Sequence, residues 1–163
     1  MKTRQFTLKL ATVAAVVSAS MIPLRAASSD TQDLNFTINE VIEFDALEAA
    51  VGLTIAAFDN SGNGNFNQTG HYKLQCNANS ARKVTVALDS AMPAHTSLDI
   101  SMVAPVGAAH VGPIASLGTM ATDLLTGINK VNVISSDINY TFRATVLAST
   151  GNFTRTVTFS VVP

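Results

Sequence analysis

The residues whose types and spacing come closest to a chemical motif lie in one glycine- and asparagine-rich stretch, FDNSGNGNFNQTGHY, at residues 58–72. Within it, Asp59, Ser61, Asn63 and Gly64 follow the spacing of a calcium loop. In such a loop, oxygens at alternate positions ligate the ion, and a glycine at the sixth position allows a sharp turn around it. The first chemistry to consider is therefore coordination of a hard cation by oxygen atoms.

The remainder of this stretch weakens that interpretation. The twelfth position of a calcium loop is normally a glutamate that binds the ion through both oxygens, and here it is Gly70. With one carboxylate in the loop, the affinity would be low. The composition instead favours a solvated loop between two strands. A weak calcium site completed by acidic residues elsewhere, such as Glu43 or Asp45, is the alternative.

The histidine and cysteine residues indicate little further chemistry. His71, His95 and His110 are far apart, and none has the His-x-His or His-x-x-x-His spacing of a zinc site, so we predict no metal ligands. Cys76 is the only cysteine, which excludes a disulfide within the chain. Because it lies in an alternating, strand-like run, YKLQC, we expect its thiol to be buried in a core.

Catalytic patterns are also missing from the sequence. There is no Gly-x-Ser-x-Gly turn, and no spacing that would pair a cysteine with a histidine. The acidic pairs Glu40/Glu43 and Asp45/Glu48 are explained equally well by the exposed face of a strand. We therefore predict that the protein is not an enzyme, with no catalytic residues and no cofactor.

The N-terminal sequence predicts export from the cell. Lys2, Arg4 and Lys9 precede an apolar run that ends at Leu24 and is followed by small residues, which is the pattern of a secretory signal peptide. The run is shorter than the roughly 20 apolar residues that span a bilayer. We assign residues 1–26 to the signal peptide, with cleavage after Ala26 or one residue later. Residues 27–163 then form one secreted, extracellular or cell-surface domain, with no stable membrane insertion.

Cleavage changes the charge of the chain. Four of the ten basic residues leave with the leader and none of the eleven acidic residues do, which gives the mature chain a net charge of −5. Binding to nucleic acid is not expected, because it requires a basic face. Residues 27–72 hold seven acidic residues and no Lys or Arg, whereas six basic residues outnumber four acidic ones from residue 73 onward. This asymmetry is either scatter on a solvated surface or head-to-tail complementarity between copies.

Periodicity predicts an all-β fold. Apolar residues alternate with polar ones in several short runs, as in strands with one buried face, and turn-forming residues separate these runs. The turn residues STGN at 149–152 predict a hairpin between the last two runs. Residues 40–51 contain good helix formers, but the alternation within them favours a strand. The clearest runs lie at residues 34–38, 84–88, 98–102, 138–146 and 157–161.

Seven to nine short strands in one domain of this size indicate a single Ig-like antiparallel β-sandwich. It follows a flexible polar tail at residues 27–33, the part of the mature chain before the first alternating run.

The C-terminal part of the sequence also carries a family resemblance. The runs KVTVALDSAMPAHTSLDISMVAPVGAAHVGPIASLGTMATDLLTGI and SDINYTFRATVLASTGNFTRTVTFSVVP resemble secreted bacterial β-sandwich proteins of surfaces and extracellular fibres. The similarity extends from about Tyr72 to the end. Its motifs are structural: MP before a strand, AP after it, and a closing Tyr-x-Phe-x-Ala-x-Val run. The resemblance implies a fold and a location, and it transfers no catalytic residue.

A strongly apolar and weakly charged secreted domain is suited to self-assembly. Hydrophobic residues make up 47% of the chain and charged residues 13%, so few surface charges oppose association. We predict a structural subunit of an extracellular filament or surface layer, in which the segment Leu34-Asn-Phe-Thr-Ile38 adds as a strand to the sheet of another copy. The residues predicted to mediate assembly are Leu34, Phe36 and Ile38.

Two alternatives stay open. In the first, residues 34–38 are simply the first strand of a monomeric sandwich. The alternative function is a secreted or cell-surface binding module for a glycan or another surface ligand, in which Phe58, Phe66 and Tyr72 would be aromatic platforms beside the glycine-rich loop.

Overall fold

The computed structural model describes residues 32–163, which are all β and contain no helix. The chain divides into two units, Met1–Thr37 and Ile38–Pro163, and the eight strands belong to the second. The signal peptide predicted at residues 1–26, and the tail as far as residue 31, lie outside the described residues.

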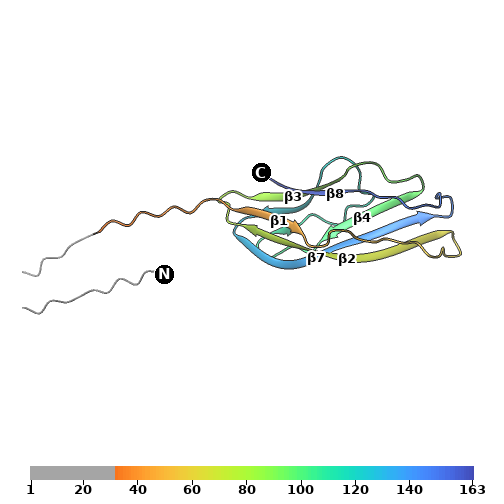
Figure 1. The fold of residues 1–163 in the computed structure, drawn as a ribbon, viewed down its shortest axis with the longest axis horizontal. Coiled ribbons are helices and arrows are strands. Elements are labelled where there is room, and N and C mark those ends of the chain that lie inside the picture. The colour runs from red at the N-terminus through yellow and green to blue at the C-terminus, as the bar shows by residue number, and fades with distance from the viewer. Residues whose placement is uncertain (1–31) are drawn as a thin grey trace, which may run out of the picture. The chain divides into compact units, whose positions relative to one another are not determined.

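The first sheet contains four antiparallel strands in the order β1-β2-β7-β4 (Figure 1). Strands β2 and β7 pair along almost their whole length, with Phe66 opposite Phe142 and a register shift between Tyr72 and Leu74. The strands are β1 (Ile42–Ala46), β2 (Asn63–Cys76), β4 (Thr96–Met102) and β7 (Val131–Thr145).

The second sheet is also antiparallel and has the order β5-β6-β3-β8. Its last strand, β8, pairs with β3 so that Phe159 lies opposite Val86. The strands are β3 (Arg82–Leu88), β5 (Ala109–His110), β6 (Thr122–Ile128) and β8 (Val157–Val162).

The two sheets share one hydrophobic core, which makes the arrangement sandwich-like. Side chains alternate between the two faces of a strand, so every second residue of β2 is buried from Gly70 to Cys76. Tyr72 and Leu74 from the first sheet belong to the same buried cluster as Val84 and Val86 from the second. The buried Tyr72 hydroxyl donates a hydrogen bond to the Val103 carbonyl oxygen at 2.6 Å, so its polar end is satisfied.

The structure confirms the all-β prediction and places a strand, β1, within residues 40–51. Two sequence-based expectations are wrong. The turn at 149–152 does not close a hairpin, because β7 and β8 belong to different sheets. Residues 34–38 are not the first strand of the sandwich: no strand is assigned between residue 32 and residue 41, and β1 begins at Ile42.

Candidate functional site

The predicted cation loop is held together by hydrogen bonds among its own residues. One oxygen of the Asp59 carboxylate, Oδ1, accepts hydrogen bonds from the backbone N–H groups of Ser61 at 2.9 Å and Asn63 at 2.8 Å. The backbone N–H of Gly62 donates to the Asp59 carbonyl at 2.9 Å. Gly62 has a φ of 77°, which few other residues adopt, and this explains the glycine in the turn. The Asp59 side chain is thus used as a turn-forming acceptor.

The acids proposed to complete a calcium site lie at the other end of the sheet. Asp59 is beside the start of β2 at Asn63, whereas Glu43 and Asp45 are opposite residues 73–75 on the same strand. Ten residues of extended chain separate the two places by about 33 Å. Glu43 and Asp45 therefore cannot share an ion with Asp59. Within the described part of the chain, no group of three or more His, Cys, Asp or Glu side chains is arranged to hold a metal.

The acidic residues around β1 are paired within the chain. The Glu43 carboxylate accepts a hydrogen bond from Lys73 Nζ at 2.8 Å, which lowers the pKa of Glu43. Glu40 pairs with Arg82 at 2.7 Å. The asymmetry between an acidic N-terminal part and a basic remainder thus corresponds to contacts between β1 and the strands that follow it, and attraction between copies is not needed to explain it.

A cluster that the sequence did not predict joins Glu48, His71 and Asp137. Glu48 follows β1, and its carboxylate accepts hydrogen bonds from both the ring Nδ1 and the backbone N–H of His71, each at 2.6 Å. Asp137 stands opposite His71 in the β2/β7 pair, with 3.7 Å between its carboxylate and Nε2. The hydrogen bond to Glu48 raises the pKa of His71 above its usual 6.5, and the bonds from His71 lower the pKa of Glu48.

This cluster holds the chain that leaves β1 against β2. The backbone N–H of Leu47 also donates to the His71 carbonyl at 2.9 Å. Gly70 leaves room for the Glu48 carboxylate, since a Cβ there would lie 3.1 Å from Oε2. In the part that the structure describes, the side-chain contacts of this imidazole are with Glu48 and Asp137.

The other two histidines and the cysteine stand apart from this cluster. His95 is exposed in the turn before β4, and His110 is exposed in β5. Cys76 is a buried free thiol at the end of β2, as expected from the alternation.

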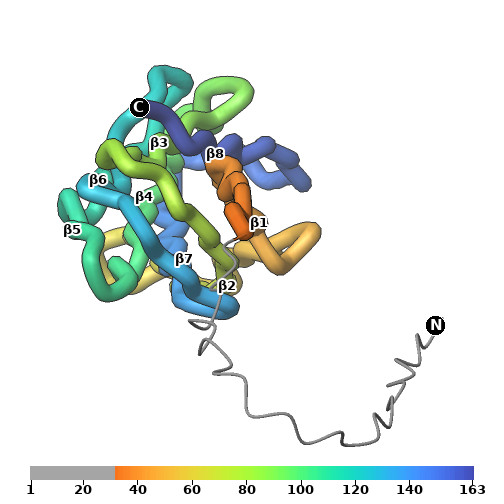
Figure 2. The backbone as a smooth tube through the Cα atoms, turned by 90° about the vertical axis from the view of Figure 1, so that its left-hand side faces the viewer, coloured from red at the N-terminus to blue at the C-terminus, as the bar shows by residue number. Residues whose placement is uncertain are grey.

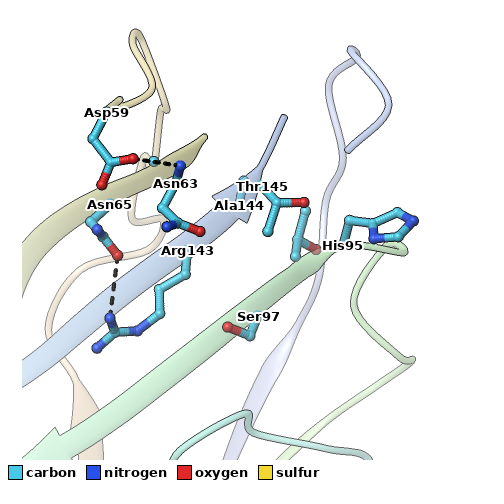
Figure 3. A pocket seen from close by; sticks show the side chains of 10 residues that line it. Asp59, Asn63, Asn65, His95, Ser97, Arg143, Ala144 and Thr145 are labelled. Atoms are coloured by element: carbon cyan, nitrogen blue, oxygen red, sulfur yellow. Dashed lines mark hydrogen bonds between the residues drawn. The ribbon is translucent and has the colours of Figure 1, made fainter. Parts of the chain in front are cut away.

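A shallow polar cleft of about 420 Å³ lies at the end of the first sheet, next to the Asp59 turn (Figure 3). The Arg143 guanidinium at its floor donates to Asp99 at 2.8 Å and to Asn65 at 3.3 Å. Figure 3 shows the His95 ring directed away from Ser97, so no serine–histidine pair is formed. The cleft offers hydrogen-bonding groups and no activated nucleophile. It is lined by Asp59, Asn63, Gly64, Asn65, His95, Thr96, Ser97, Arg143, Ala144 and Thr145.

Two of the three predicted aromatic platforms are accessible to some degree. Phe58 is exposed and Phe66 is partly exposed, but Tyr72 is fully buried and takes part in the core. Tyr72 is therefore excluded as a binding platform. It stacks on Phe44 at 5.6 Å between ring centroids, which is a packing role.

The three residues predicted to mediate assembly have strongly exposed side chains. The exposed fraction is 72% for Leu34, 84% for Phe36 and 87% for Ile38. On an extended backbone, alternate side chains lie on one side, so these three would form a continuous apolar strip, and a contiguous exposed apolar surface is typical of an interaction site. They lie in a segment with no strand assignment, so its backbone N–H and C=O groups are not used by a ladder of the described structure.

No family model matches the chain, and no curated protein or solved structure shows significant similarity to it. Among the described residues, no helix is long and apolar enough to cross a membrane.

Proposed function

We propose that the protein is a secreted structural subunit, with an Ig-like sandwich fold, that builds an extracellular filament or surface layer by exchange of β-strands between copies. The observation that carries this proposal is the exposed alternating segment Leu34-Asn-Phe-Thr-Ile38. An extended segment of this kind is stabilised when its backbone joins a sheet edge and its alternate side chains enter apolar contacts. A second copy of the chain can supply both the sheet edge and the apolar contacts.

The geometry of such an exchange leads to a linear polymer. The donor segment and its acceptor are different surfaces of one subunit, so the contact is heterologous. A heterologous contact that does not close into a ring continues as a filament. The proposed location, outside the cell, comes from the predicted signal peptide and the family resemblance described above.

Substitution of the three apolar residues tests this function. In the secreted chain, Leu34→Ser, Phe36→Ser and Ile38→Ser together should abolish filaments seen by electron microscopy and leave soluble subunits with an unchanged β-type circular dichroism spectrum. The subunits should stay folded because the core begins after this segment. The matched control, Asn35→Ser with Thr37→Ser, keeps the apolar alternation and should keep the filaments. Wild-type protein that stays monomeric when concentrated, or a triple variant that still polymerises, would disprove the proposal.

The second candidate function is a surface-ligand or glycan-binding module, supported by the polar cleft at the Asp59 turn. Its asparagine, serine and arginine side chains suit hydroxyl groups, and Phe58 lies next to the lining residue Gly64. Screening against a glycan array distinguishes the two functions. A binder should retain a specific glycan signal in the triple serine variant and lose it on Asn63→Ala, whereas the structural subunit should give no specific signal.

A further inference from the structure

The four outer strands of the two sheets differ in how well their free edges are covered. The outer edge of β4 is already occupied, because Ile100 and Ile114 exchange backbone hydrogen bonds at 3.0 and 2.8 Å and Leu117 donates to Leu98 at 2.7 Å. Strand β5 has only two residues, Ala109 and His110, and is too short to pair with a five-residue segment. Strands β1 and β8 are left as candidate acceptors.

Charge separates these two candidates. Glu43 and Asp45 lie within β1, and charged side chains on an edge strand oppose the addition of another strand. Strand β8, with the sequence VTFSVV, contains no charged residue and no proline, and in the described structure it pairs with β3 alone. An uncharged edge of six residues with high β-propensity is a template for a further strand.

The side chains of β8 also match those of the exposed segment. Val157, Phe159 and Val161 pack against the core but are only partly buried, although they lie on its inward face. Their spacing of two residues is the same as that of Leu34, Phe36 and Ile38. A strand added here would cover these half-buried residues with three apolar side chains that are now in water.

The outer backbone groups of β8 are not paired with the strand that lies beside it. Strands β1 and β8 lie near each other at one side of the sandwich but belong to different sheets (Figure 2). Their contact includes the rings of Phe44 and Phe159, whose centroids are 5.4 Å apart. No backbone hydrogen bond joins the two strands within the described residues, so the outer N–H and C=O groups of β8 keep their capacity to pair.

We propose that the free edge of β8 is the acceptor site, and that its occupant is the segment Leu34–Ile38 of a second copy, with Phe36 seated opposite Phe159. This inference rests on the proposed function and specifies the surface that the donor segment occupies. Alignment of the two apolar triplets gives the Phe36–Phe159 pair in both parallel and antiparallel orientations. The outward-facing residues then distinguish them: Asn35 lies opposite Thr158 if the strands are parallel and opposite Ser160 if they are antiparallel.

The chain just after the donor segment is anchored in a way that favours a second copy over its own β8. The Asn77 side chain accepts a hydrogen bond from the Val41 N–H at 2.6 Å and donates one to the Asn39 carbonyl at 2.9 Å. The backbone N–H of Asn77 donates to the Val41 carbonyl at 3.1 Å. Residues 39–41 are held at Asn77, directly after the end of β2, so pairing of residues 34–38 with β8 of the same subunit would need a reversal within these anchored residues. Such a reversal would break these contacts and the Glu40–Arg82 ion pair.

Disulfide trapping in the full secreted chain tests this site. The double variants Asn35→Cys/Thr158→Cys and Asn35→Cys/Ser160→Cys place thiols on exposed positions, away from the core. After oxidation, one of them should give a ladder of covalent multimers on a non-reducing gel, and the reactive pair reports the strand direction. The matched control, Asn35→Cys/Asp45→Cys, places the second thiol on the exposed face of β1 and should give no ladder. The single variant Asn35→Cys should give dimers at most.

Each of the following outcomes refutes a specific part of the proposal. Filaments without a ladder from either β8 pair, or a ladder from the Asp45 control alone, would refute the β8 acceptor and leave the proposed function standing. A cross-link confined to single chains would refute the second copy as occupant. If electron microscopy shows no filaments for the wild type or the variants, and neither β8 pair gives a ladder, the proposed function fails together with the acceptor site.

Discussion

At the scale of single residues, the most specific interaction is the pair formed by Glu48 and His71. Glu48 bonds both the ring and the backbone of His71, so it is one carboxylate that ties two groups of β2 to the end of β1. This pairing has a direct consequence for the pH dependence of stability, because the two pKa values move in opposite directions.

The sign of each contribution follows from linkage. The pKa of His71 is raised in the folded state, so its contribution is complete below its usual pKa of 6.5 and is lost as the pH rises through the folded value. The pKa of Glu48 is lowered, so its contribution is complete above its usual 4.5 and is lost as the pH falls through the folded value. The pair should therefore stabilise the fold most between pH 4.5 and 6.5.

Chemical denaturation across this range tests the prediction with Glu48→Gln. The difference in unfolding free energy between wild type and variant should be largest near pH 5.5, and should shrink at higher pH without vanishing, since the backbone hydrogen bond to Glu48 persists. In a His71→Gln background, Glu48→Gln should change the unfolding free energy less than it does in the wild type. The double variant should therefore lose little more stability than either single variant. A difference that does not vary with pH would contradict the role assigned to the ion pair.

At the scale of elements, alternation in the sequence located three of the eight strands closely. The runs at 84–88, 98–102 and 157–161 are β3, β4 and β8 to within two residues at each end. The partner of each strand could not be predicted in the same way. Turn residues at 149–152 indicate a reversal of the chain, but they do not determine which sheet receives the next strand. For the same reason the Glu48–His71 contact was missed: Glu48 lies two residues after β1, and the local sequence does not show that β1 pairs with the part of β2 next to His71.

The edge strand β8 has no charged side chain, and this leads to a prediction at the scale of elements. Thr158→Lys with Ser160→Lys would place two cations on the exposed face of the edge strand. The folded subunit should tolerate them because both side chains point to solvent, so its thermal midpoint should change little. Assembly should be strongly reduced, since charges on an edge oppose strand addition. Light scattering of concentrated protein measures this effect.

A control on a central strand separates edge protection from a general effect of charge. Asn139→Lys with Thr141→Lys adds two lysines, spaced by two residues, to the outward face of β7, at positions that pair with both β2 and β4. This variant should assemble like the wild type. Equal inhibition by both pairs of lysines would show that net charge, and not the edge of β8, controls association.

At the scale of the whole molecule, the distribution of charge distinguishes two ways in which copies could associate. The sequence alone allowed an attraction between an acidic part of one copy and a basic part of the next. In the structure, Glu40, Glu43 and Glu48 each contact a basic or histidine side chain of the same chain. Both segments proposed to pair, residues 34–38 and residues 157–162, are uncharged. The driving force for assembly should then be burial of apolar surface together with backbone pairing.

Ionic strength gives an independent test of that driving force. Raising sodium chloride from about 50 mM to about 500 mM shortens the screening length from roughly 14 Å to roughly 4 Å, which would weaken attraction between exposed charges. For this protein the rate of filament growth, followed by light scattering, should stay the same or rise slightly, because copies with the net charge of −5 predicted after cleavage of the leader repel one another less when screened. A fall in rate of about tenfold or more would instead indicate that association depends on complementary charged surfaces. The lysine pair on β8 should remain poorly assembling at both salt concentrations if it acts by desolvating charge at the strand edge, since screening does not remove that cost.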